Sequence, residues 1–154
     1  MRTSSTFVAV LAALAFFGSA RAADDDAVKK ALARLQGTWR LVSFEGRNLR
    51  LDDESLKDFR LKIVGNTFDC TGCKLHFEGT FKIVEVVGKV RKTDATYTKA
   101  DGDLGGKTVP QLAEWIDDDS FRTCWPSFMG ELKRPTKFTT SGDEAIIVFR
   151  REKK

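Results

Sequence analysis

The sequence predicts an all-β domain, a small antiparallel up-and-down barrel of about eight strands preceded by one short helix. From Thr38 to Arg151, apolar and polar residues alternate in short runs, which turn-forming Gly, Asn, Asp and Ser residues separate at short intervals. No helical segments alternate with these runs, which argues against a parallel sheet with crossover helices. A closed barrel is favoured over a sandwich because closure leaves no exposed sheet edge.

The chain begins with a segment typical of an export signal. Arg2 precedes an uncharged apolar run from Phe7 to Phe17, and Ala20-Arg21-Ala22 follows with the small-x-small pattern of a cleavage site. The run is shorter than the roughly 20 apolar residues that a membrane-spanning helix needs. We therefore expect residues 1–22 to be a signal peptide. Residues 23–154 are then one exported domain, periplasmic or secreted, without a membrane span.

Charge argues against a nucleic-acid partner. The full chain has a formal net charge of +4 and a pI near 9.0. Arg2 and Arg21 belong to the expected signal peptide, so its removal lowers the net charge to +2. The remaining basic residues form no long block before the C-terminal tail from Arg150 to Lys154.

A short helix is predicted from Asp24 to Leu35. Its apolar residues have helical spacing, the aspartates at its start suit a helix N-terminus, and Gly37 ends it. A second, partly helical piece is expected from Asp52 to Asp58. The predicted strands are 38–45, 59–63, 67–70, 74–84, 89–97, 108–116, 120–125, 137–140 and 145–151.

Alternation assigns the inward faces of these strands. In the first strand, Trp39, Leu41 and Ser43 share one face. The longest strand is expected to direct a set of large apolar residues inward, namely Leu75, Phe77, Phe81 and Ile83.

Gly37-Thr38-Trp39 opens the first strand directly after the helix, and it looks like the G-x-W element of lipocalin-like barrels. In that superfamily the tryptophan closes one end of the barrel and packs against a basic residue of the last strand. The resemblance therefore implies that Trp39 closes the barrel. It also implies that Arg150, or alternatively Arg151, contacts Trp39 by a cation–π interaction.

A wider set of motifs resembles an uncharacterised, lipocalin-like family of secreted domains that is abundant in planctomycete bacteria. The similarity extends from about Val28 to Lys153 and implies the fold and an exported location, without an assigned reaction or cofactor. The motifs are Leu35-Gln36-Gly37-Thr38-Trp39, Glu78-Gly79-Thr80-Phe81, Gly106-Lys107-Thr108, Arg134-Pro135-Thr136-Lys137-Phe138 and Arg151-Glu152-Lys153.

Cys70 and Cys73 are the sharpest local feature. If Thr71-Gly72 is a two-residue hairpin turn, Cys70 faces Cys73 near disulfide distance. Phe68 and Leu75 then face each other on the same side of the hairpin. An oxidising compartment favours a disulfide between these cysteines. A redox-active pair or half of a zinc site stays an alternative, although no second C-x-x-C or H-x-H supplies further ligands.

Cys124 is the remaining cysteine. It alternates with Phe121, Thr123 and Trp125, so we expect it to point away from their face as a free thiol. His76, the only histidine, shares a face with Lys74 and Glu78 and is expected on the polar side of its strand.

The sequence contains no complete set of catalytic residues, so the hypothesis that the protein is an enzyme is less favoured. The first hypothesis is a small exported binding or interaction module, whose partner is a small apolar ligand in the barrel or a docked protein. The alternative is a thiol- or metal-dependent protein that uses Cys70 and Cys73. If a pocket exists, its aromatic residues are expected among Trp39, Trp115, Trp125 and Phe128.

Overall fold

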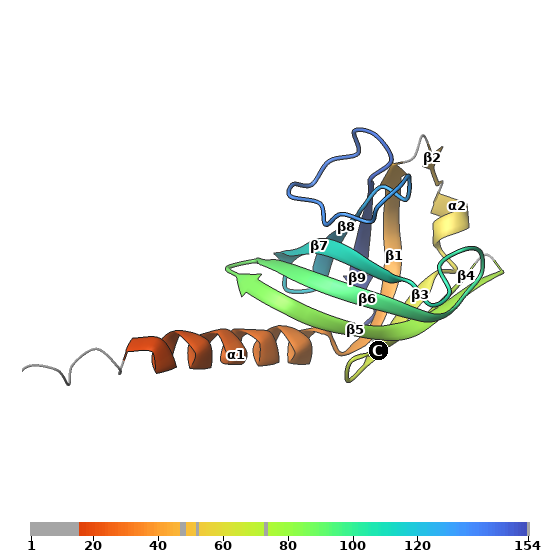
Figure 1. The fold of residues 1–154 in the computed structure, drawn as a ribbon. Coiled ribbons are helices and arrows are strands. Elements are labelled where there is room, and N and C mark those ends of the chain that lie inside the picture. The colour runs from red at the N-terminus through yellow and green to blue at the C-terminus, as the bar shows by residue number, and fades with distance from the viewer. Residues whose placement is uncertain (1–15, 47–48, 52, 73, 154) are drawn as a thin grey trace, which may run out of the picture.

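The computed structural model describes residues 16–46, 49–51, 53–72 and 74–153, and within them the chain forms a closed antiparallel β-barrel (Figure 1). The sheet order is β2-β1-β3-β4-β5-β6-β7-β8-β9, and an additional pairing of β1 with β9 closes it. Eight strands form the barrel, which confirms the expected fold class, while the two-residue β2 extends β1 at one end.

The elements of the described residues follow one another along the chain as a meander. They are α1 (Phe16–Leu35), β1 (Gly37–Gly46), β2 (Leu49–Arg50), α2 (Asp53–Leu56), β3 (Arg60–Val64), β4 (Thr67–Gly72), β5 (Leu75–Val87), β6 (Val90–Ala100), β7 (Thr108–Asp117), β8 (Ser120–Trp125) and β9 (Ala145–Arg151).

Helix α1 includes the predicted helix, Asp24 to Leu35, but begins earlier, at Phe16. The added residues are rich in alanine, which has the highest helix propensity. Residues 1–15 of the expected signal peptide lie outside the described residues. In the described part of the chain, no helix has both the length and the apolar character needed to cross a membrane.

The two ends of the barrel differ in construction. At one end, short turns follow β3, β5 and β7, and α1 lies along the outside of β5 (Figure 1). We call this the sealed end. At the other end, which we call the mouth, residues 101–107 connect β6 to β7 and residues 126–144 connect β8 to β9.

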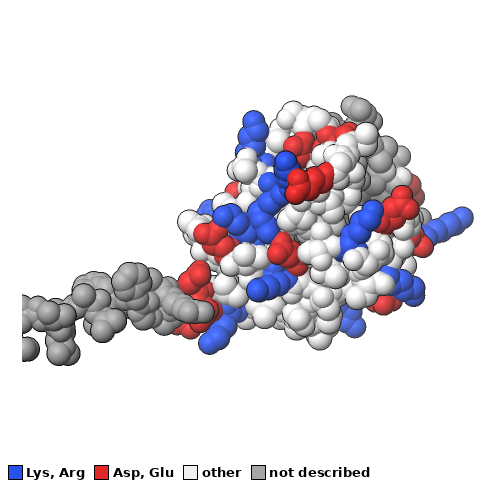
Figure 2. Space-filling view, in the orientation of Figure 1, with Lys and Arg blue, Asp and Glu red and all other residues white. Residues whose placement is uncertain are grey.

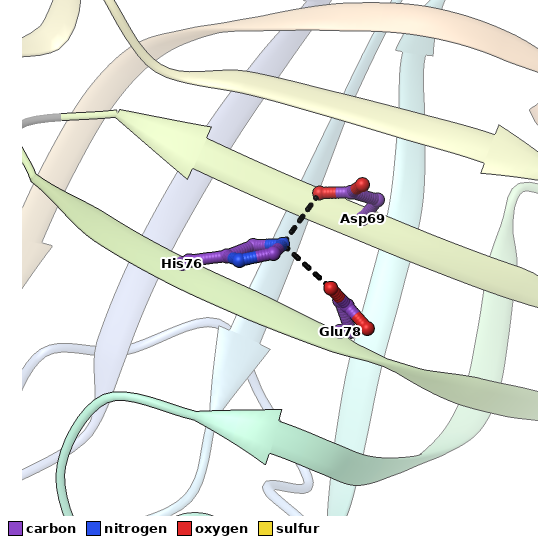
Figure 3. A group of neighbouring side chains, drawn as sticks. All are labelled: Asp69, His76 and Glu78. Atoms are coloured by element: carbon purple, nitrogen blue, oxygen red, sulfur yellow. Dashed lines mark hydrogen bonds and ion pairs between the residues drawn. The ribbon is translucent and has the colours of Figure 1, made fainter.

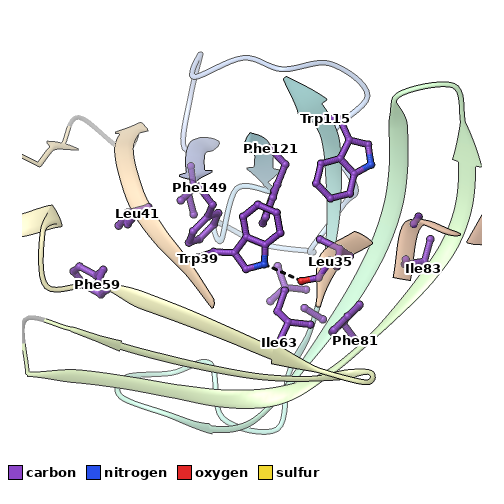
Figure 4. Packing of buried hydrophobic residues seen from close by; sticks show 14 of the residues in the cluster. Leu35, Trp39, Leu41, Phe59, Ile63, Phe81, Ile83, Trp115, Phe121 and Phe149 are labelled. Carbon is purple, nitrogen blue, oxygen red and sulfur yellow. Dashed lines mark hydrogen bonds between the residues drawn. The ribbon is translucent and has the colours of Figure 1, made fainter. Parts of the chain in front are cut away.

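Trp39 is the centre of the sealed end (Figure 4). Its side chain is fully buried, with its ring centroid 4.8 Å from that of Phe121 and 6.1 Å from that of Trp115. The indole Nε1 donates a hydrogen bond to the Leu35 carbonyl oxygen at 2.8 Å, so the ring is fixed to the C-terminus of α1. The chain leaves the helix through Gly37, whose φ of +117° favours glycine.

Arg151, and not Arg150, packs against Trp39. The guanidinium carbon of Arg151 lies 4.2 Å from the Trp39 ring centroid, whereas Arg150 donates a hydrogen bond to Ser120 Oγ at 3.4 Å. The register explains the correction, because Trp39 is directly opposite Arg151 and Arg40 is opposite Arg150. Arg150 therefore points to the other face of the sheet.

Two further expectations are wrong. Residues 137–140 form no strand, because β8 pairs directly with β9 and leaves no place for a strand between them. Ser43 does not continue the inward face of β1, because the register between β1 and β9 shifts between Leu41 and Ser43. This bulge brings Phe44 to the barrel interior instead.

Candidate functional site

The barrel interior holds a cavity of about 750 Å³ that opens at the mouth. Its volume lies within the range of about 300–1,000 Å³ that is typical of small-molecule pockets. Most of its wall is apolar and aromatic, as expected for a site that takes an apolar ligand. The predicted inward faces largely form this wall, including Phe59, Leu61 and Ile63 of the β3 region and Leu75, Phe77 and Phe81 of β5.

Aromatic side chains line the mouth. Trp125 ends β8, and its ring centroid lies 6.1 Å from those of both Tyr97 and Phe128. Leu104 and Leu132, from the two long connections, also border the cavity. Of the four aromatic residues expected near a pocket, Trp125 and Phe128 line it.

Trp39 and Trp115 instead belong to the packed sealed end.

The β8–β9 connection is fixed to the barrel through Arg134. Its Nη1 donates hydrogen bonds to the carbonyl oxygens of Thr93, at 3.0 Å, and Gln111, at 2.6 Å. Its Nη2 forms an ion pair with Asp94. The connection that borders the mouth is therefore held to β6 and β7.

Among the described residues, one charged side chain is buried inside the barrel. Arg91 is only 3% exposed, and its guanidinium carbon lies 4.5 Å from the Trp115 ring centroid and 4.8 Å from that of Phe121. Its Nη1 has no hydrogen-bond partner. Burial, and secondly the positive charge of Arg34, lower the pKa of Arg91 to about 9, so it still carries its charge at neutral pH.

Arg91 is part of a polar patch on the cavity wall, which consists of Arg91, Thr93, Gln111 and Thr123. Thr93 is directly opposite Gln111 in the β6–β7 ladder, and Thr123 Oγ1 donates a hydrogen bond to Gln111 Oε1 at 3.3 Å. Thr93 Oγ1 is buried and, like Arg91 Nη1, has no partner. The polar patch therefore contains two unsatisfied polar atoms. The other charged residues that line the cavity, Asp101, Asp103 and Lys107, belong to the β6–β7 connection at the mouth.

Cys70 lines the cavity as a free thiol, and the described residues form no disulfide. Cys73 lies outside the described residues. The predicted hairpin register is wrong, because Gly72 pairs with Leu75 and Cys70 pairs with Phe77. Burial, and secondly the charge of Asp69, raise the pKa of Cys70 to about 11, so its thiol is protonated and a weak nucleophile at neutral pH.

Cys124 is buried on the other side of the sheet from the cavity. Phe121, Thr123 and Trp125 line the cavity and Cys124 does not, as the alternation predicts. Its Sγ donates a weak hydrogen bond to the carbonyl oxygen of Thr139 at 3.6 Å, and burial raises its pKa. The segment predicted as the strand 137–140 thus covers this outer face.

A second group of functional side chains lies on the outer face of the β4–β5 hairpin (Figure 3). His76 Nε2 lies 2.9 Å from Glu78 Oε1 and 3.2 Å from Asp69 Oδ1. The ligand atoms of the three residues lie within 4.8 Å of one another, a spacing that could hold a metal ion. All three side chains are partly exposed, and Lys99 Nζ lies 3.6 Å from Glu78 Oε1.

Strand parity predicts that His76 and Glu78 share a polar face, but it does not find Asp69. Asp69 enters the group because the hairpin turn lies two residues later than expected, which places Asp69 opposite Glu78. Arg91 was also missed, although alternation with Thr93, Ala95 and Tyr97 could have assigned it to the interior.

The face of the molecule that Figure 2 shows has mixed charge. Lys and Arg side chains are interspersed with Asp and Glu over the face shown in Figure 2. That face therefore has no extended basic area of the kind that binds nucleic acid.

Comparisons of the chain with models of protein families, with curated proteins and with solved structures gave no significant match. Its function has therefore to be inferred from its own residues.

Proposed function

We propose that this protein is an exported, lipocalin-like barrel that binds a small apolar ligand in its interior. The cavity of about 750 Å³ inside the closed barrel carries the proposal. An eight-stranded barrel can either fill its interior with side chains or hold one small ligand, and this barrel leaves room for a ligand.

The composition of the wall supports an apolar ligand. Phe68, Phe77, Tyr97, Trp125 and Phe128 all border the cavity, and their rings expose apolar surface to it. Removing apolar surface from water contributes about 25 cal/mol per Å², so a ligand that covers these rings gains affinity from the hydrophobic effect. The four polar side chains of the polar patch are then available to orient it.

The competing thiol chemistry has less support. A thiol nucleophile or metal ligand acts as the thiolate, whereas burial keeps Cys70 protonated at neutral pH. Cys70 also faces Phe77 rather than a second thiol. The group of Asp69, His76 and Glu78 does not include Cys70 and lies on the opposite face of the hairpin from the cavity wall.

Filling the cavity tests the proposal. Ala95 is buried on the inward face of β6, whereas the next residue, Thr96, is half-buried on the outward face. The full chain, expressed with export, is titrated with 1-dodecanol by isothermal calorimetry. We expect saturable binding that Ala95→Phe weakens at least about tenfold by occupying the cavity. The matched variant Thr96→Phe should bind normally.

Circular dichroism confirms that both variants fold. If the wild-type protein binds no 1-dodecanol, or if Ala95→Phe and Thr96→Phe bind it equally well, the cavity is not the site and the proposal is wrong.

A further inference from the structure

We infer that the ligand carries a carboxylate head, which the polar patch binds through Arg91 and Thr93 at the deep end of the cavity. This inference rests on the proposed function, since it specifies the chemical class of the ligand that the barrel takes. It starts from the two buried polar atoms without a partner, Arg91 Nη1 and Thr93 Oγ1.

Both residues belong to β6 and are separated by one position, so their side chains leave the strand on the same face. Both line the cavity. A carboxylate offers two oxygens with about four acceptor sites, whereas a guanidinium and a hydroxyl group both donate. One carboxylate can therefore satisfy Arg91 and Thr93 together.

Arg122 and Arg134 show how unusual Arg91 is. Arg122 and Arg134 are less buried than Arg91, and each donates hydrogen bonds within the protein. None of the ion pairs found in the described part of the chain involves Arg91. A buried cation is costly without a partner, and contacts with aromatic rings compensate only in part.

The local electrostatic field also favours an anion. Arg34 lies close to the same ring as Arg91, with its guanidinium carbon 3.9 Å from the Trp115 centroid. Its positive charge disfavours the charged form of Arg91. Two like charges near one ring, one of them unpaired, create a positive potential that an anionic head would relieve.

The rest of β6 shows the direction in which the ligand lies. Arg91 is near the sealed end, and Tyr97 is nearer the mouth beside Trp125. At about 3.3 Å per residue, the strand extends roughly 20 Å from Arg91 to Tyr97. The head is thus placed at the bottom and an apolar tail along Ala95, Phe77 and Trp125 toward the mouth. An amphipathic carboxylate with an unbranched tail matches this arrangement.

The test compares probes with the same tail and different heads. Dodecanoate, 1-dodecanol and dodecyltrimethylammonium are titrated into the wild-type protein at neutral pH by isothermal calorimetry. We expect dodecanoate to bind about 10- to 100-fold more tightly than 1-dodecanol, as for a charge-assisted hydrogen bond in a buried site. The cationic probe should bind most weakly.

Variants then locate the head. Arg91→Met removes the guanidinium but keeps an unbranched side chain, and it should abolish the preference for dodecanoate over 1-dodecanol. Arg34→Met is the matched control, because Arg34 contacts the same tryptophan but does not line the cavity. It should retain the preference. Thr93→Val should weaken the binding of dodecanoate by about 3- to 10-fold.

The outcomes separate the two proposals. If none of the three probes binds, the proposed function fails. If 1-dodecanol binds and dodecanoate binds no more tightly, the barrel takes apolar ligands but the carboxylate subsite is wrong. A preference for dodecanoate that survives in Arg91→Met would also overturn the assignment of Arg91.

Discussion

Arg151 and Arg91 both lie over tryptophan rings of the barrel, yet their surroundings are opposite. At the sealed end, Arg151 lies over Trp39 and donates hydrogen bonds to the carbonyl oxygens of Gln36, at 2.8 Å, and Arg34, at 2.6 Å. In the cavity, Arg91 lies over Trp115 with Nη1 unsatisfied. An arginine is therefore hydrogen-bonded within the protein at the sealed end, whereas an arginine in the cavity has a nitrogen atom without a partner.

A structural cation differs from a ligand-binding one in whether the protein itself supplies its partners. Arg151 satisfies carbonyl groups that the C-terminus of α1 cannot bond internally, and its charge is favourable at that end of the helix dipole. Arg91 makes the chain less stable by itself, because it is buried without an anion. A buried polar group without a partner in the protein calls for an explanation, and the cavity beside Arg91 provides one.

The largest expected effect is at the sealed end. Arg151→Met should lower the free energy of unfolding by about 3–5 kcal/mol, because two charge-assisted hydrogen bonds to partly buried carbonyl oxygens and the ion pair with Asp119 are lost. Arg150→Met is the matched control and should cost less than about 1 kcal/mol, since Arg150 is exposed. Urea unfolding measures both. Equal losses in the two variants would show that Arg151 does not maintain the seal.

The second expected effect is a gain in stability at Arg91. Arg91→Met should raise the free energy of unfolding of the ligand-free protein by about 1–4 kcal/mol, because an apolar side chain replaces an unpaired buried charge. Thermal unfolding without ligand measures the change. A clear loss of stability would mean that the contacts of Arg91 with Trp115 and Phe121 outweigh its burial, and that the comparison between the two arginines does not hold.

The same variant has a pH signature. Burial lowers the pKa of Arg91 from its usual, higher value to about 9 in the folded protein, so above about pH 9 the unfolded chain binds more protons than the folded chain. The stability of the wild type therefore rises relative to that of Arg91→Met as the pH increases above about 9.

The smallest effect concerns the thiol of Cys70. Its pKa is raised from 9.0 to about 11, so the folded state retains its proton, and the stabilisation from this group is lost as the pH rises from 9.0 through about 11. Alkylation by iodoacetamide, mapped by mass spectrometry, should be slow at neutral pH and accelerate over this range. Because Cys70 lines the cavity, dodecanoate should slow it further. Rapid alkylation at neutral pH would contradict the burial of this thiol.

The regular part of the fold follows from the sequence for a simple reason. Each barrel strand has one face in the core and one in solvent, so its residues alternate, as Phe59, Leu61 and Ile63 do. The helix before Gly37 is predictable in the same way from its apolar spacing. These patterns depend only on neighbours along the chain.

Strand register and strand pairing depend on contacts between distant segments, and local sequence patterns predict them wrongly at two places. Thr71-Gly72 has the composition of a turn, yet β4 continues through Gly72 and the left-handed position is taken by Lys74, with a φ of +64°. That shift removes the predicted pairing of Cys70 and brings Asp69 to His76. Residues 137–140 have the residue types of a strand, but β8 and β9 already pair with each other.

The candidate site shows the same limit. Apolar residues on inward faces predict a lined interior, but whether their volumes fill it depends on the bulge at Leu41 and Ser43 and on the position of the β8–β9 connection. The role of Arg91 depends on an absent partner, which no local pattern reveals. The sequence therefore predicts the wall of the site better than its chemistry.

The closure of β1 against β9 has a consequence for the order of folding. Trp39 comes early in the domain and Arg151 comes almost last, so the seal joins segments that are synthesised at opposite ends of the chain. Until β9 is available, the preceding strands form an open sheet with two unpaired edges, which can pair with other chains. A nascent chain that ends before β9 should therefore aggregate rather than fold. The barrel can close only after β9 has been synthesised.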